Sequence, residues 1–164
     1  MKIVLLSDTH NYLDDAIKKH LKKADEIWHA GDIGNIELLD ELQAIKPIRA
    51  VYGNIDDAKI RKACPKEQFF EVDGQKIYMI HIGGYPPKYT TVLKQRLLEL
   101  KPTIFICGHS HILKVIYDKN INCLHLNPGA AGIYGFHKVR TLLKFEINSG
   151  KLENMQIVEL GKRG

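Results

Sequence analysis

Polar side chains that can bind metal ions follow several apolar segments of this sequence. His109 and His111 lie two residues apart, directly after an apolar run. Asp8 and His10 have the same spacing, and they too follow a run of aliphatic residues. Residues at this spacing in an extended segment point in the same direction. Each pair can therefore present its donor atoms to a single ion.

Three further apolar segments end in Asp, Asn or His. The residues that follow them are Asp32 after Gly31, Asn54 after Gly53, and His81. Carboxylate, amide and imidazole donors together suit divalent ions such as Mn²⁺, Fe²⁺ and Zn²⁺. The full set of candidate metal ligands is Asp8, His10, Asp32, Asn54, His81, His109 and His111. This set exceeds the roughly three or four protein ligands of one catalytic zinc ion, and it fits two ions that share a carboxylate.

Strands that precede these residues must position them. Roughly the first two-thirds of the chain alternates strand and helix patterns. The expected strands are Lys2–Leu6, Glu26–His29, Ile48–Tyr52, Gln68–Val72, Gln75–Ile82 and Thr103–Cys107. We expect Asn11 to cap a first helix and Asn35 to cap a second one. Pro86-Pro87 is expected to open a third helix that ends at Leu100. In α/β folds, sites form where the carboxyl ends of strands meet, so the candidate ligands should converge.

The last part of the chain has a different pattern, of strands joined by turns. These strands are Leu113–Tyr117, Cys123–Leu126, Thr141–Ile147 and Lys151–Val158. The sequence thus predicts an α/β front and an antiparallel back, which two sheets with helices on their outer faces would accommodate. Residues 130–137 are rich in small side chains. We interpret them as a surface loop, with a lining of the substrate cleft as the alternative.

The composition predicts one globular, soluble domain over residues 1–164. The chain is 45% hydrophobic and 26% charged, and no apolar run approaches the ~20 residues of a membrane helix. The N-terminal apolar run meets Ser7-Asp8 too early for a signal peptide. Cys64, Cys107 and Cys123 form no CxxC pair, which indicates buried thiols in a reducing compartment. We therefore expect a cytoplasmic protein.

The formal net charge of +5 comes partly from lysine-rich helix faces, which are usually solvated. Weak attraction to anionic substrates is the alternative interpretation. Basic runs interleaved with aromatic residues are absent, which argues against nucleic acid as a partner. A homo-oligomer is compatible with the sequence, which leaves the oligomeric state open.

The order of the motifs resembles that of the calcineurin-like metallophosphoesterases. It comprises Asp8-x-His10, Gly31-Asp32, Gly53-Asn54-x-Asp56, His81 and Gly108-His109-x-His111, followed by the turn Asn127-Pro128-Gly129. The length and spacing are similar to those of the small prokaryotic phosphodiesterase branch of that superfamily. The resemblance implies an α/β (α+β) fold, a four-layer αββα sandwich of two mixed sheets flanked by helices, with a two-metal site at the strand ends.

Carried over to this sequence, the family pattern implies a role for each candidate ligand. The ligands implied for the first ion are Asp8, His10 and His111, and those implied for the second ion are Asn54, His81 and His109. Asp32 would bridge both ions. His29 and Asp56 would orient the ligands, although packing beside Trp28 is an equal alternative for His29.

One position departs from the wider family. Many members have histidine after the asparagine, where this chain has Ile55. The small phosphodiesterase branch usually lacks that histidine as well. The departure therefore supports this branch and argues against strong monoesterase or protein-phosphatase activity.

We therefore expect a metal-dependent phosphodiesterase that acts on a small phosphodiester substrate. A hydroxide shared by two divalent ions would attack phosphorus, with Asp32, Asn54 and His81 as the catalytic residues. The resemblance implies Mn²⁺, with Ni²⁺, Fe²⁺ or Zn²⁺ as alternatives. The rival hypothesis is a non-catalytic scaffold of the same fold, like the retromer subunit that resembles this family but has a degraded ligand set. A nuclease would share the chemistry but would need a basic groove that tracks a strand.

Overall fold

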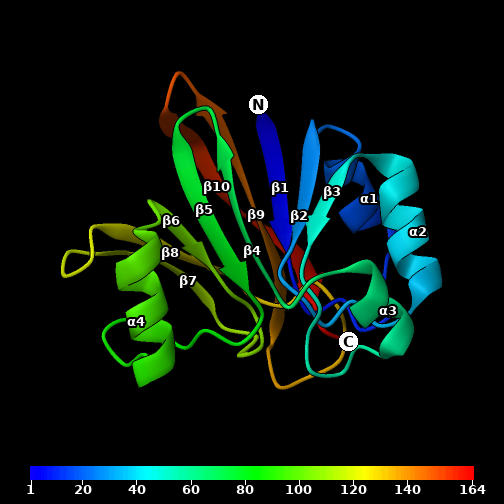
Figure 1. Cartoon of the computed structure of the whole chain (residues 1–164). Coiled ribbons are helices and arrows are strands. Elements are labelled where there is room, and N and C mark those ends of the chain that lie inside the picture. Colours follow the sequence, from blue (N-terminus) through cyan, green and yellow to red (C-terminus); the bar gives the residue numbers. More distant parts are fainter.

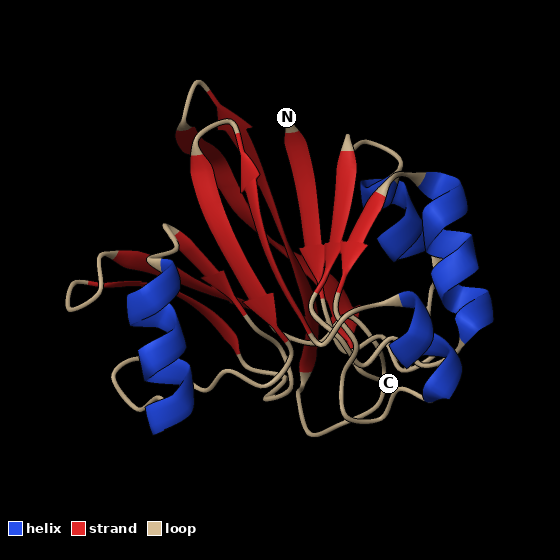
Figure 2. Cartoon of the chain, viewed as in Figure 1, coloured by secondary structure: helices blue, strands red, loops and turns tan.

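Two β-sheets lie face to face in the computed structural model, which describes residues 1–164, and helices cover both outer faces (Figure 1). The helices beside the first sheet are α1 (Asp15–Leu21), α2 (Ile36–Ile45) and α3 (Ala58–Ala63). The helix α4 (Thr91–Leu100) lies beside the second sheet (Figure 2). The layers follow the order helix, sheet, sheet, helix, which confirms the predicted αββα sandwich.

The first sheet combines strands from both ends of the chain. Its strand order is β10-β9-β1-β2-β3. The bounds are β1 Lys2–Leu6, β2 Glu26–His29, β3 Ile48–Ala50, β9 Val139–Asn148 and β10 Lys151–Lys162. Strands β1, β2 and β3 run parallel, whereas β9 pairs antiparallel with both β1 and β10. The last two strands of the chain therefore complete the α/β sheet and do not form an antiparallel sheet of their own.

The second sheet has the strand order β4-β5-β6-β8-β7. The bounds are β4 Glu67–Val72, β5 Gln75–Ile80, β6 Ile104–Ile106, β7 Leu113–Asp118 and β8 Cys123–Pro128. Strands β5, β6 and β8 run parallel, and the edge strands β4 and β7 are antiparallel to their neighbours. The turn between β4 and β5 is Asp73-Gly74, as predicted.

Alternating side chains of β1 separate two layers of apolar core. Ile3 and Leu5 pack with Trp28 in the core between the two sheets. Val4 and Leu6 point the opposite way, into the core beneath the helices α1 and α2. These four β1 side chains are at most 2% exposed, which explains why a strand buried on both faces is apolar throughout. The loop that follows β1 therefore begins from a rigidly packed strand.

The predicted start of the first helix is wrong, and that of the second is confirmed. Asn35 caps α2, since its side chain accepts a backbone N–H of the first turn at 2.9 Å. The cap of α1 is Asp14, whose carboxylate accepts the N–H of Ile17 at 2.9 Å. Asn11 has a φ of 66°, and its N–H donates to the carbonyl of Ile33. Asn11 therefore belongs to the loop after β1.

The last two helices also differ from the prediction. Pro86-Pro87 lies in the loop before α4, and Thr90 caps that helix by accepting the N–H of Leu93 at 3.2 Å. The helix α3 was not predicted, because a segment of six residues is too short to show a helical period. None of the helices combines the length and the apolar character needed to cross a bilayer.

Candidate metal centre

The loops that follow β1, β2, β3, β5 and β6 gather at one end of the sandwich (Figure 1). They bring six of the predicted ligands into two groups, which are Asp8, His10 and His111 in the first and Asp32, His81 and His109 in the second. Within each group, the candidate donor atoms lie within 4.8 Å of one another. The loops thus converge at the carboxyl ends of the strands, as the fold class leads one to expect.

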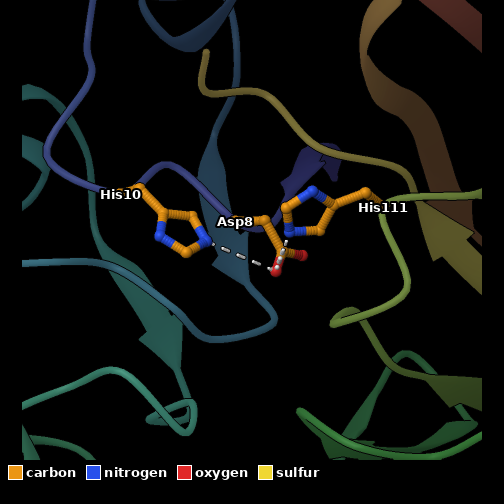
Figure 3. A group of neighbouring side chains, drawn as sticks. All are labelled: Asp8, His10 and His111. Atoms are coloured by element: carbon orange, nitrogen blue, oxygen red, sulfur yellow. Dashed lines mark ion pairs between the residues drawn. The ribbon is translucent and has the colours of Figure 1, made fainter. Parts of the chain in front are cut away.

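Asp8 lies between the two histidines of the first group (Figure 3). Its buried Oδ1 is 3.1 Å from Nε2 of His111 and 4.0 Å from Nε2 of His10, but neither contact is aligned as a hydrogen bond. Its Oδ2 accepts the backbone N–H of His109 at 3.1 Å. Asp8 Oδ1 and His10 Nε2 are therefore buried polar atoms without a hydrogen-bond partner. Two such atoms near the same point fit a bound cation.

His10 has the protonation state that metal binding requires. Burial lowers the pKa of its imidazole more than the neighbouring carboxylates of Asp32 and Asp8 raise it, so the pKa lies below its ordinary value. The ring is therefore neutral at neutral pH, and neutral imidazole is the form that binds a metal ion.

Asp32 belongs to the second group and also faces His10 of the first. Its Oδ2 is 3.4 Å from Nε2 of His10, and its Oδ1 is 3.2 Å from Nε2 of His81. The backbone N–H of Ile55 also donates to Oδ1, at 3.0 Å. Burial raises the pKa of Asp32, but the hydrogen bond and charge of His81 outweigh burial, so the pKa lies below its ordinary value. Asp32 is therefore an ionised carboxylate with one oxygen toward each group.

His81 has one ring nitrogen fixed by the backbone and the other directed into the site. Its Nδ1 is 2.7 Å from the carbonyl oxygen of Ala30, which can only accept, so Nδ1 carries a proton. Its Nε2 faces Oδ1 of Asp32 and Oδ1 of Asn54, the latter at 3.1 Å. Burial lowers the pKa of His81, but Asp32 and Asp8 raise it above its ordinary value. A ring nitrogen that faces two oxygens needs a positive charge, which a second proton or a metal ion supplies.

Two glycines let the ligand-bearing loops approach one another closely. A Cβ atom at Gly53 would lie 2.0 Å from Oδ1 of Asp32. A Cβ atom at Gly31, which has a φ of +97°, would lie 2.6 Å from Nδ1 of His81. Any side chain at either position would therefore displace a candidate ligand.

Asp56 ties together the loops that follow β2 and β3. Its buried carboxylate accepts backbone N–H groups at 2.7–3.2 Å, which are those of Gly53, Gly34 and Ile33. Because Asp32 and Asn54 lie in these same loops, Asp56 fixes the backbone beside two of the predicted ligands. Asp56 itself belongs to neither ligand group.

His29 makes a comparable connection between the loops after β1 and β2. Its Nδ1 accepts the backbone N–H of Gly31 at 3.2 Å, and its Nε2 lies 2.9 Å from Oγ1 of Thr9. Burial lowers the pKa of His29 to about 4, so the ring is neutral at neutral pH. His29 thus holds the backbone of the ligand loops, and it is more than a packing neighbour of Trp28.

Residues 130–137 contribute to the site, which favours the alternative that they line the cleft over the interpretation as a plain surface loop. Tyr134, Gly135 and Phe136 line a cleft of 240 Å³ together with His10, Asp32, Asn54, Ile55, His109, Ser110 and His111. The ring of Tyr134 lies 5.1 Å from that of His10. A Cβ atom at Gly135 would meet Nδ1 of His111 at 2.1 Å, so the loop passes directly over this ligand.

His137 is a site residue that the sequence analysis did not identify. Its Nε2 is 2.9 Å from the carbonyl oxygen of Gly132, so Nε2 carries a proton and donates it. In the neutral ring Nδ1 is then an acceptor, and it lies 3.3 Å from Nδ1 of His111. His111 must donate from Nδ1, which leaves its Nε2 with a lone pair beside Asp8. In the sequence, His137 appears only as a histidine close to Gly132 and Gly135, and no motif marks it as a site residue.

Asn54 and Ile55 form the edge of the cleft. The side chain of Asn54 is exposed, and its Oδ1 lies 3.1 Å from Nε2 of His81. The side chain of Ile55 is 43% exposed and lines the cleft at the position where many family members have histidine. The backbone N–H of Ile55 donates to Oδ1 of Asp32, so Ile55 offers no free donor to the cleft.

The fold agrees with the sequence family. The model of the calcineurin-like phosphoesterase superfamily domain matches residues 1–150, and the chain belongs to this superfamily. A probable metallophosphoesterase from Methanothermobacter thermautotrophicus is 30% identical over 137 residues, which cover 79% of this chain and 77% of that protein. The resemblance seen in the motifs is therefore confirmed. Membership supports a phosphoesterase activity, and the two His/Asp groups are candidate sites for the divalent ions that the family implies.

Solved structures share the whole architecture. A structure described as a novel archaeal phosphodiesterase is 21% identical, with a TM-score of 0.74 and coverage of 96% of this chain and 100% of that chain. Vps29 from Entamoeba histolytica, solved in complex with Zn²⁺, is 18% identical, with a TM-score of 0.76 and coverage of 98% and 100%. At these identities the likeness concerns the fold alone.

Proposed function

We propose that this chain is a metal-dependent phosphodiesterase with its catalytic site in the cleft beside Asp32. The observation that carries the proposal is the placement of Asp32, with one carboxylate oxygen toward each of two His/Asp groups. The buried atoms without partners at Asp8 and His10 support a cation at this place. The family and the archaeal phosphodiesterase fold support the same class of reaction.

In this proposal three ligands would hold each ion, and the two ions would share one further ligand. Asp8, His10 and His111 would hold one ion, and Asn54, His81 and His109 would hold the other. Asp32 would bridge both. When bound, two divalent ions lower the pKa of a shared water molecule toward neutrality and supply positive charge to phosphoryl oxygens. Mn²⁺ is the ion we propose, because the mixed oxygen and nitrogen donors suit it and the family resemblance favours it.

The residues of the chain would orient the ligands and the substrate. Asp56 and His29 fix the backbone of the ligand loops through the hydrogen bonds described above. Asn54 lines the cleft and contacts His81, so both would lie beside the bound phosphoryl group. Because Ile55 can donate no proton, substrates with acidic leaving groups, such as aryl phosphodiesters, should react faster than alkyl monoesters.

We further propose that residues 1–164 act as one domain. The strand β10 pairs along its length with β9, so the segment beyond the family match completes the first sheet. The three free, buried cysteines support our proposal of a cytoplasmic, reducing environment. The substrate that we propose is a small phosphodiester.

A non-catalytic binding module is the second candidate function. The observation that favours it is the close likeness in fold to Vps29. The six candidate ligands that lie together favour catalysis instead, because a module that binds only through its surface has no need of them. The two candidates differ in whether any metal ion restores turnover.

The test is hydrolysis of bis(p-nitrophenyl) phosphate before chelation, after chelation, and after addition of Mn²⁺, Ni²⁺, Fe²⁺ or Zn²⁺ singly. We expect turnover to disappear on chelation and to return with Mn²⁺. Asp8→Asn should lower the rate of turnover by more than about 100-fold, since loss of a metal ligand affects activity more than loss of a group that orients one. Asp40→Asn, at an exposed carboxylate of α2, is the matched control and should behave as wild type. A lack of turnover with every ion would refute the proposal and favour the binding module.

A further inference from the structure

A second pocket adjoins the candidate metal centre on the side of β5. It has a volume of 390 Å³, and its lining includes Asn54 and His81 of the metal centre. The other lining residues are Tyr52, Gly53, Arg61, Lys66, Ile80 and Ile82. Because Asn54 also lines the cleft above the site, the pocket and the cleft meet at this residue. A substrate bound at the metal centre can therefore extend into the pocket.

The guanidinium of Arg61 is held in a fixed position at this pocket. Its Nε donates to the carbonyl of Asp56 at 2.7 Å, and its Nη2 donates to the carbonyl of Asn54 at 3.2 Å. Its Cζ lies 4.8 Å from the centre of the Tyr52 ring. The helix α3, which carries Arg61, is capped by Asp57 and so follows directly from the loop of the metal centre. The donors on Nη1 remain free for a ligand.

Two basic side chains line this pocket, and no carboxylate does. Arg49, Arg96 and Arg140 each form an ion pair with an acidic side chain. Arg61 and Lys66 form none, although both line the pocket. A preorganised guanidinium without a carboxylate partner, next to an ammonium group, is suited to bind a phosphate group.

We propose that this pocket binds a second phosphate group of the substrate. The substrate would then be a phosphodiester in which one of the esterified organic groups also carries a phosphate. Arg61 and Lys66 would contact that phosphate, while Tyr52, Ile80 and Ile82 would contact the organic group between the two phosphorus atoms. The proposal rests on the proposed function, since it assigns the first phosphorus to the metal centre.

The test compares two substrates that differ only in the second phosphate. They are thymidine 5′-(p-nitrophenyl phosphate) and the same ester with a 3′-phosphate. For the Mn²⁺-loaded protein, we expect kcat/KM to be about tenfold or more higher for the 3′-phosphorylated ester, because charge-assisted hydrogen bonds to phosphate are strong. In Arg61→Gln combined with Lys66→Gln, the ratio between the two substrates should fall toward unity.

Lys62→Gln is the matched control, because Lys62 is exposed on the same helix and does not line the pocket. It should leave the ratio as in wild type. The proposal is overturned if wild type shows no preference, if the double variant keeps the preference, or if Lys62→Gln removes it equally. In the last case the preference would come from the general charge of the surface.

Calorimetry separates a failure of this proposal from a failure of the proposed function. Thymidine 3′,5′-bisphosphate should bind wild type about tenfold or more tightly than thymidine 5′-phosphate, and the double variant should lose this difference. If bis(p-nitrophenyl) phosphate is not hydrolysed but the difference in binding is present, the pocket assignment holds and the catalytic proposal fails. Hydrolysis of that ester without a difference in binding overturns the pocket assignment alone.

Discussion

At the scale of single residues, Asp32 and Asp8 differ in how many ligand groups they touch. Asp32 faces His10 with one oxygen and His81 with the other, whereas Asp8 contacts only histidines of the first group with Oδ1. We therefore expect Asp32→Asn to weaken binding of both ions, because one shared negative charge is lost beside two cations. Asp8→Asn should weaken mainly one ion. Metal analysis of the purified variants checks this, and an Asp32→Asn protein that still holds both ions would contradict the bridging role.

His137 also acts on a single candidate ligand, because its ring contacts that of His111. We expect His137→Ala to lower the affinity of the site formed with Asp8 by about 10–100-fold, because a ligating histidine loses the group that orients it. The affinity of the site formed with Asp32 and His81 should change little. Calorimetric metal titrations measure both sites.

The replacement His137→Asn supplies an acceptor for His111 and should restore part of the affinity. His20→Ala, on the helix α1, is the control for loss of a histidine elsewhere in the chain. Equal weakening of both sites in His137→Ala would mean that the loop acts generally and does not orient His111.

At the scale of elements, the loops after β2 and β3 depend on Asp56. Removal of its carboxylate leaves three buried or half-buried backbone N–H groups without their acceptor. We expect Asp56→Ala to lower the free energy of unfolding by about 2–4 kcal/mol. Asp57→Ala removes only the cap of α3 and should cost about 1 kcal/mol. Urea unfolding of both variants is the measurement, and equal costs would show that Asp56 does not hold the loops together.

The strands and helices also differ in how well the sequence predicts them. Buried strands were identified well, because a strand covered on both faces is apolar throughout, as in Lys2–Leu6. The candidate ligands were inferred from the residues that follow these strands, and six of them lie together in the structure. Helix starts were harder, because Asn11 and Asp14 are both suitable caps and the choice depends on a bond from Asn11 to Ile33, which lies in another loop.

For a similar reason, the sequence left open whether residues 130–137 line the cleft. His137 and Tyr134 reach the site because the chain crosses from β8 to β9 above His111 and His10. The spacing of residues in the sequence gives no indication that this segment passes over the site. The pocket at Arg61 likewise depends on the short helix α3, which has no detectable period.

At the scale of the whole molecule, a buried histidine away from the metal centre should make stability depend on pH. His125 lies fully buried on β8, with its ring 5.3 Å from that of Phe105. Burial lowers the pKa of His125 from 6.5 to about 4. The unfolded chain therefore binds the proton first as the pH falls, so stability is lost between about pH 6.5 and pH 4. The full loss attributable to His125 is about 3 kcal/mol.

The variant His125→Phe keeps an aromatic ring in place and cannot be protonated. Urea unfolding with chelator present, at about pH 7.5 and about pH 5, should show a smaller loss of stability for the variant than for wild type. His29 is also buried with a lowered pKa, but it is present in both proteins and cancels in the comparison. Parallel pH profiles for the two proteins would show that His125 is not the cause.

The two sheets together bring the ligands from five strand ends to one place, and this convergence is the basis of the proposed catalysis by a pair of ions. The most direct measurement is turnover of bis(p-nitrophenyl) phosphate as metal-free protein is titrated with Mn²⁺, with bound metal measured in parallel. If both ions must occupy the same chain, turnover rises more steeply than bound metal and reaches its maximum at about two ions per chain. Turnover that is already maximal at about one ion per chain, or that is absent at full occupancy, would contradict the account.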